Sequence, residues 1–149
     1  EPMGNVNYTI HRFFTGTGFV VRWASLSTSS GTADAGQAFP SSIDYGLMSA
    51  LFSDKSVQVF RPSGSTCQVL IRGSNNPIAV ASSDMVFSTL TDPQGNALQI
   101  PAAGVTNTIE QILENCLFIS PLVTTVSAST EAATVDLLFS SVRSARSGM

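Results

Sequence analysis

Two β-rich runs separated by a short polar cluster are the strongest structural signal in this sequence. They lie in the segment 53–74, which reads SDKSVQVFRPSGSTCQVLIRGS. The first run alternates apolar and polar side chains around Val57 and Val59, and the second does so around Val69 and Ile71. Alternating runs joined by a Pro/Gly/Ser cluster predict an antiparallel hairpin with a turn of about four residues.

The predicted hairpin carries apolar side chains on both of its faces. Phe60 and Leu70 fall where a half-exposed strand would place polar residues. One face is therefore expected to cover the core, and the other a helix, a long loop or a neighbouring subunit. The tip is small and polar, which suits close packing near a symmetry axis, and we predict a subunit contact there at Pro62, Ser63, Gly64 and Ser65.

Further alternating runs predict strands along the whole chain. The strongest are Val6–Phe14, Phe19–Leu26 and Thr134–Val142, which are rich in β-branched and aromatic residues, and the first two could pair directly. Shorter candidates are Met85–Leu90, Ala97–Pro101 and Leu117–Leu122, with Val123–Ser127 either extending the last of these or forming its neighbour.

Two short helices are predicted in the connections between strands. Ile43–Leu51 follows a serine that can cap its start and repeats apolar residues every four positions. In Thr108–Asn115, Asn107 followed by Glu110 matches a capping box. The apolar stripe of this second helix would consist of Ile109, Ile112, Leu113 and Cys116.

Eight or nine short strands without βαβ alternation predict an all-β sandwich or barrel. The first and last strong strands lie at opposite ends of the chain, as in a Greek key whose terminal strands pair near the middle of a sheet. We therefore predict an antiparallel jelly roll of eight to nine strands. No internal repeat and no change of composition divides the chain, so residues 1–149 are expected to form one domain.

The composition favours a protein that assembles with other subunits. Charged residues make up 11% of the chain, against about 25% in typical soluble domains, so Ser, Thr, Asn and Gln must cover much of the surface. Burying such a surface against another subunit requires little ionic desolvation. A Ser/Thr-rich β protein that does not assemble explains the composition about equally well. The sequence has no 18-residue apolar run, so no membrane span is predicted.

The sequence does not predict an enzyme. His11 is the only histidine and lies in an alternating run, where a structural role is the simpler interpretation. The nucleophile elbow, the Walker loop and the dinucleotide fingerprint are all absent from the sequence. One histidine and two distant cysteines cannot form a zinc site within one chain. No cofactor is therefore predicted, with one exception. Calcium could bind between subunits at Asp54, Asp84 and Asp92. The alternative is that these three residues are solvated acids in loops.

Cys67 and Cys116 lie in apolar runs and are predicted to be buried thiols, with a disulfide between them as the alternative. The formal net charge of −3 argues against nucleic-acid binding by the chain as a whole. The candidate RNA contacts are Arg12, Arg143 and Arg146. The alternative interpretation of Arg143 and Arg146 is a solvated basic tail that binds no RNA.

The layout of these predicted elements resembles the coat protein of a small icosahedral RNA virus of the satellite type, with a single jelly-roll domain. The resemblance rests on the order of elements over most of the chain and not on a signature motif. It implies self-assembly into a T=1-like shell of about sixty copies around packaged RNA. It also implies a location in the virion, after assembly in the host-cell cytoplasm.

Coat proteins of this family carry an Arg/Lys-rich N-terminal arm that neutralises the packaged RNA, and this sequence contains no such run. The resemblance therefore implies either that an arm precedes Glu1 or that few basic side chains hold the RNA. The alternative function is a trimeric jelly-roll module that binds a receptor or a sugar, or a protruding capsid domain. Its candidate binding aromatics, each explained more simply by core packing, are Tyr8, Phe13, Trp23 and Tyr45.

Overall fold

The computed structural model describes residues 8–13, 18–27, 52–76, 86–128 and 131–142. Within these ranges the chain forms nine strands and no helix, which confirms the all-β prediction. No helix in this part of the chain is long and apolar enough to cross a membrane. The strands are β1 (Tyr8–Arg12), β2 (Gly18–Ser27), β3 (Phe52–Phe60), β4 (Gln68–Ser74), β5 (Ser88–Thr89), β6 (Gln99–Ile100), β7 (Asn107–Gln111), β8 (Phe118–Thr125) and β9 (Ala132–Val142).

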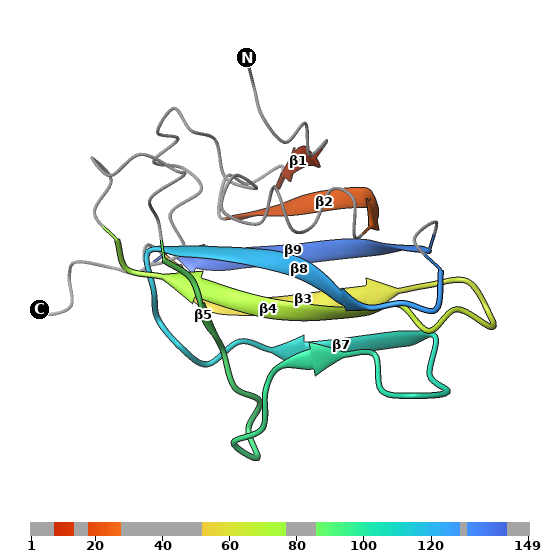
Figure 1. Cartoon of the computed structure of the whole chain (residues 1–149). Helices are drawn as coiled ribbons and strands as arrows, with labels where there is room; N and C mark the ends of the chain where they lie inside the picture. The colour runs from red at the N-terminus through yellow and green to blue at the C-terminus, as the bar shows by residue number, and fades with distance from the viewer. Residues whose placement is uncertain (1–7, 14–17, 28–51, 77–85, 129–130, 143–149) are drawn as a thin grey trace, which may run out of the picture.

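The strands form two antiparallel sheets. The first has the order β1-β2-β9-β3-β7. In the second, β8 pairs with one edge of β4, and β5 and β6 pair with the other. Figure 1 shows β4 and β8 lying in front of β3 and β9, so that the two sheets are stacked as layers.

The hydrophobic core lies between the two layers. Successive side chains of a strand point to opposite faces, so every second residue of the long strands is buried there. At one end, the rings of Phe19, Phe52 and Phe139 pack with centroids 5.1 to 5.7 Å apart. The largest fully buried side chains come from both sheets and are Trp23, Phe19, Phe139, Ile71, Leu98, Ile119 and Leu137.

The predicted pairing of the first two strands and the predicted last strand are both confirmed. β1 pairs with β2, with Ile10 opposite Val21. β9 corresponds to the predicted run Thr134–Val142 and lies between β2 and β3 in the first sheet. β9 is therefore an interior strand of this sheet. Alternating residues of β9, including Val135 and Leu137, are buried in the core.

The prediction of a hairpin over 53–74 is wrong, although both of its strands are present. The turn forms as expected, since the N–H of Ser65 donates to the carbonyl of Pro62 at 3.0 Å and Gly64 has a φ of 86°. However, β3 pairs with β9 and β7, whereas β4 pairs with β8, β5 and β6. The turn therefore carries the chain from one sheet to the other. Alternation identifies a strand and its buried face, but not the strand that receives its hydrogen bonds.

The prediction of a helix over Thr108–Asn115 is also wrong. Residues 107–111 form β7, which pairs with β3 at the edge of the first sheet. Of the proposed apolar stripe, Ile112 and Cys116 are buried, whereas Ile109 and Leu113 are 63% and 54% exposed. Pairing with β3 therefore overrides the local helical signal. The other predicted helix, Ile43–Leu51, lies outside the described residues.

β5 and β6 are the two halves of one interrupted strand. Both run antiparallel to β4 along the same edge, and the chain leaves that edge between them. The N–H of Leu98 donates to the carbonyl of Leu90 at 2.8 Å, and Thr91 forms a bridge with Ala97. The residues 91–97 therefore form a protruding loop that is closed at its base.

Candidate contact surface at the β3–β4 turn

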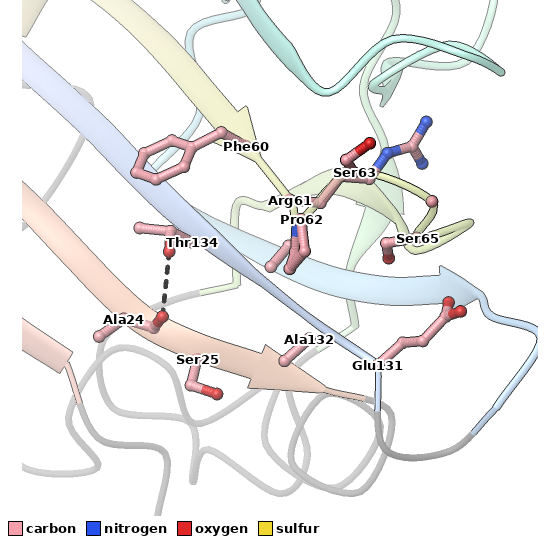
Figure 2. A pocket seen from close by; sticks show the side chains of 12 residues that line it. Ala24, Ser25, Phe60, Arg61, Pro62, Ser63, Ser65, Glu131, Ala132 and Thr134 are labelled. Carbon is pink, nitrogen blue, oxygen red and sulfur yellow. Dashed lines mark hydrogen bonds between the residues drawn. The ribbon is translucent and has the colours of Figure 1, made fainter.

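A surface groove of about 720 Å³ lies where the chain crosses between the sheets, at the end of β3 and the start of β9. Figure 2 shows the side chains around it, with Phe60 and Thr134 at one end and Glu131 at the other. The hydroxyl of Thr134 donates to the carbonyl of Ala24 at 3.1 Å, which holds β9 against β2 beside the groove. The groove lining includes all four residues predicted to contact another subunit, Pro62, Ser63, Gly64 and Ser65.

Arg61 fixes the base of this turn. Its side chain is only 7% exposed and continues the buried row of Val57 and Val59. The guanidinium donates to three backbone carbonyls, those of Cys67 at 2.6 Å, Ala102 at 2.9 Å and Val105 at 3.0 Å. Three carbonyl dipoles therefore surround the buried charge, and the turn is tied to the segment 101–106. Sequence reasoning did not give Arg61 a role, although its position in the alternation predicts an inward side chain.

Glu131 joins two connections at the same end of the molecule. Its Oε1 accepts hydrogen bonds from the N–H of Thr66 at 3.2 Å and from its hydroxyl at 2.9 Å, and its Oε2 accepts one from the hydroxyl of Ser127 at 2.7 Å. Hydrogen bonds from Ser127 and then Thr66 lower the pKa of Glu131, and they outweigh the opposing effect of desolvation. The carboxylate therefore links the β3–β4 connection to the β8–β9 connection. Nothing in the sequence around Glu131 predicted this role.

The ionic groups near the groove have partners within the chain. Arg22 and Asp136 lie opposite each other on β2 and β9 and form two hydrogen bonds of 2.7 Å. Hydrogen bonding and then charge attraction from Asp136 raise the pKa of Arg22. The same guanidinium lies 5.9 Å from the ring centroid of Phe60. Because Arg61 and Glu131 are also hydrogen-bonded, another protein could cover this surface without leaving these charges unpaired.

The predicted calcium ligands have different surroundings. Asp54 is exposed on β3, and Asp84 lies outside the described residues. The carboxylate of Asp92 accepts hydrogen bonds from the N–H groups of Gln94 at 2.9 Å and Asn96 at 2.8 Å, which stabilises the 91–97 loop. Over the described ranges, no group of three or more His, Cys, Asp or Glu side chains could hold a metal ion. The calcium site stays a prediction.

Of the three predicted RNA contacts, only Arg12 is described. It is exposed at the end of β1, with its guanidinium 5.4 Å from the ring centroid of Phe19. Arg143 and Arg146 lie outside the described residues. RNA binding therefore stays a prediction.

Both cysteines are free and buried, as predicted. Burial, and then the charge of Glu131, raise the pKa of the Cys67 thiol, while Arg61 has a smaller opposing effect. Cys116 packs against Gly73, where an added Cβ would lie 2.5 Å from the sulfur. The raised pKa keeps the buried Cys67 thiol in its less reactive protonated form.

Of the four aromatic residues considered for sugar binding, the three that the structure describes do not form an exposed face. Trp23 is fully buried, and Tyr8 packs against it with ring centroids 5.9 Å apart. Phe13 is 36% exposed, and Tyr45 lies outside the described residues. Core packing accounts for Trp23 and Tyr8.

Comparison with protein-family models, with curated proteins and with solved structures finds no match. Any function must therefore be argued from the topology and the surface of this chain.

Proposed function

We propose that this chain is the coat subunit of a small icosahedral virus, built as a jelly roll, which assembles with copies of itself into a T=1-like shell around RNA. The order of strand pairing is the observation that carries the proposal. β2 pairs with β9, β3 pairs with β7, and β4 pairs with β5 and β6. The pairs are nested in the sequence. β3 and β7 both lie between β2 and β9, and β4, β5 and β6 all lie between β3 and β7.

Nested pairs of this kind arise when one long antiparallel hairpin is wrapped into two layers, which is the wiring of a jelly roll. The sheet order also fits, because the outermost pair and the next described pair share the first sheet while the innermost pair forms the second. Of the described strands, only β4 pairs with β8. A jelly roll would place one further strand along the other edge of β8.

The surface supports assembly with other subunits. Charged residues are only 11% of the chain. The charged side chains beside the groove form hydrogen bonds with other residues of the same chain. Five large apolar side chains are exposed among the described residues, which is apolar area that a shell would bury. They are Phe13, Val86, Val105, Ile109 and Leu113.

Size-exclusion chromatography with multi-angle light scattering tests the proposal. About sixty copies of a 15.6 kDa chain should elute as a uniform particle of roughly a megadalton. The same particle should appear as a sphere of uniform diameter in negative-stain images. A chain that stays a monomer or a trimer across salt, pH and protein concentration would contradict the coat function. A stable trimer would favour the trimeric binding module instead.

A further inference from the structure

The outer edge of β7 is a strand edge that other proteins could pair with. β7 is the last strand of the first sheet, and β3 is its only partner among the described strands. Unpaired edges are commonly protected by charged side chains, Pro or a bulge. β7, with the sequence NTIEQ, has no Lys, Pro or bulge, and its one charged residue is Glu110. The opposite edge strand, β1, carries His11 and Arg12. Apolar exposure is also concentrated near β7, since Ile109, Leu113 and Val105 are 63%, 54% and 40% exposed.

The hydrogen bonds to β3 determine which backbone groups of β7 point outward. The N–H of Arg61 donates to the carbonyl of Thr106, and the N–H of Ile112 donates to the carbonyl of Lys55. Hydrogen-bonded pairs alternate with non-bonded pairs in an antiparallel ladder, so Thr108 and Glu110 also direct their backbone groups toward β3. The N–H and C=O groups of the odd-numbered residues therefore point away from β3, and these are Asn107, Ile109 and Gln111.

From this arrangement we infer that β7 pairs antiparallel with β7 of a second copy of the chain, across a two-fold axis beside Ile109. In that register Ile109 faces its own copy, and Asn107 faces Gln111 of the other chain. The outward backbone groups would form about six hydrogen bonds between the two chains. The inference rests on the proposed function, because it assigns one contact of the shell.

The residue pattern around Ile109 is self-complementary in this register. On the other face of the strand, Thr108 faces Glu110 of the second copy, so a hydroxyl donor meets a carboxylate and the two Glu110 side chains do not oppose each other. Val105 and Leu113 each lie four residues from Ile109, so in this register the exposed Val105 of one chain lies on the side of Leu113 of the other. A register centred on Glu110 would instead place two carboxylates directly opposite each other.

A cysteine cross-link tests the register. In the inferred pair the two Cα atoms of residue 109 lie about 5.5 Å apart, within disulfide range. Ile109→Cys should therefore form a covalent dimer under mild oxidation, seen on a non-reducing gel. Gln111→Cys is the matched control, because its two copies would lie four residues out of register, about 13 Å apart, and should stay monomeric on the same gel. The native Cys67 and Cys116 are buried and should not cross-link.

Opposite charges test whether the contact supports assembly. Ile109→Lys and Ile109→Glu each place like charges at the axis, so each should lower the yield of particles at least about tenfold. An equal mixture of the two variants should restore the yield, since Lys then faces Glu. The same Lys substitution at Gln94, an exposed polar residue of the 91–97 loop outside β7, is the control and should assemble normally.

The outcomes separate the β7 contact from the coat function. Wild-type particles with no Ile109→Cys dimer, equal dimer from Gln111→Cys, or unchanged assembly of Ile109→Lys would overturn the β7 contact and leave the coat function standing. A specific Ile109→Cys dimer, without particles under any condition, would support the β7 contact and contradict the coat function.

Discussion

Arg61 ties the crossing between the two sheets to the segment 101–106. Its guanidinium supplies donors to the carbonyls of Cys67, Ala102 and Val105, all from inside the molecule. Arg61→Met keeps the length of the side chain but leaves these carbonyls without their donor. We expect a loss of about 3 kcal/mol in the free energy of unfolding, measured by urea denaturation. Arg61→Lys should recover only part of the loss, because one ammonium group cannot replace the planar guanidinium.

Arg22 provides the control for this prediction. It is also an arginine with two strong hydrogen bonds, but its side chain is 44% exposed. Arg22→Met should therefore lower the free energy of unfolding by less than Arg61→Met does in the same urea denaturation. Equal losses for the two variants would show that burial of Arg61 adds nothing to its contribution.

Glu131 gives a pH dependence with a definite sign. Its pKa is lowered in the folded chain from an ordinary value of 4.5, so its contribution to stability is fully present above that pH. The contribution is lost as the pH falls below 4.5 and through the lower folded pKa. Thermal melting of Glu131→Gln should therefore differ most from wild type above pH 4.5, and the two curves should converge in more acidic solution. A constant difference down to about pH 2 would rule out this linkage.

At the scale of elements, the 91–97 loop shows how one carboxylate can stabilise an excursion from a strand. Asp92→Ala removes the acceptor for the N–H groups of Gln94 and Asn96, so hydrogen exchange at these two amides should become faster. Asp92→Asn keeps a carbonyl oxygen in the same place and should retain most of the protection. Global stability should change little, because the loop lies outside the core.

The same pair of variants distinguishes this structural role from calcium binding. If Asp92 only stabilises the loop, calcium should not change the melting temperature of the wild type or of Asp92→Asn. Stabilisation of the wild type by calcium that is lost in Asp92→Asn would instead support the metal site, because the amide lacks the charge that binds the ion.

The two incorrect element predictions share a physical cause. The local pattern around Asn107 and Glu110 satisfies a helix start, yet the backbone of this segment gains its hydrogen bonds from β3. For β3 and β4, the turn at Gly64 was predicted correctly, but the choice of sheet depends on β9, which follows more than fifty residues later. Short-range patterns do not contain information about such distant partners.

At the scale of the whole molecule, the net charge of −3 sets an expectation for RNA. If Arg12, Arg143 and Arg146 hold RNA in the shell, replacing all three by Ala should lower the nuclease-protected RNA per particle and weaken its dependence on salt. Particle yield should not change, because none of the three belongs to the contacts proposed for assembly. Unchanged RNA content, measured by the ratio of absorbance at 260 and 280 nm, would assign RNA binding to other residues.

The sequence by itself determined the fold class, the positions of the long strands and the tip of the β3–β4 turn. The alternation also put Val57 with Val59, and Val69 with Ile71, on one face of their strands, and the structure shows that this face is buried. These properties follow from the two-residue period of a strand and from the turn preference of Gly and Pro, which are both local. The tertiary structure decided that β3 and β4 lie in different sheets and that β7 is a strand. It also placed Arg61 and Glu131 across the connections, because such contacts join segments far apart in the chain.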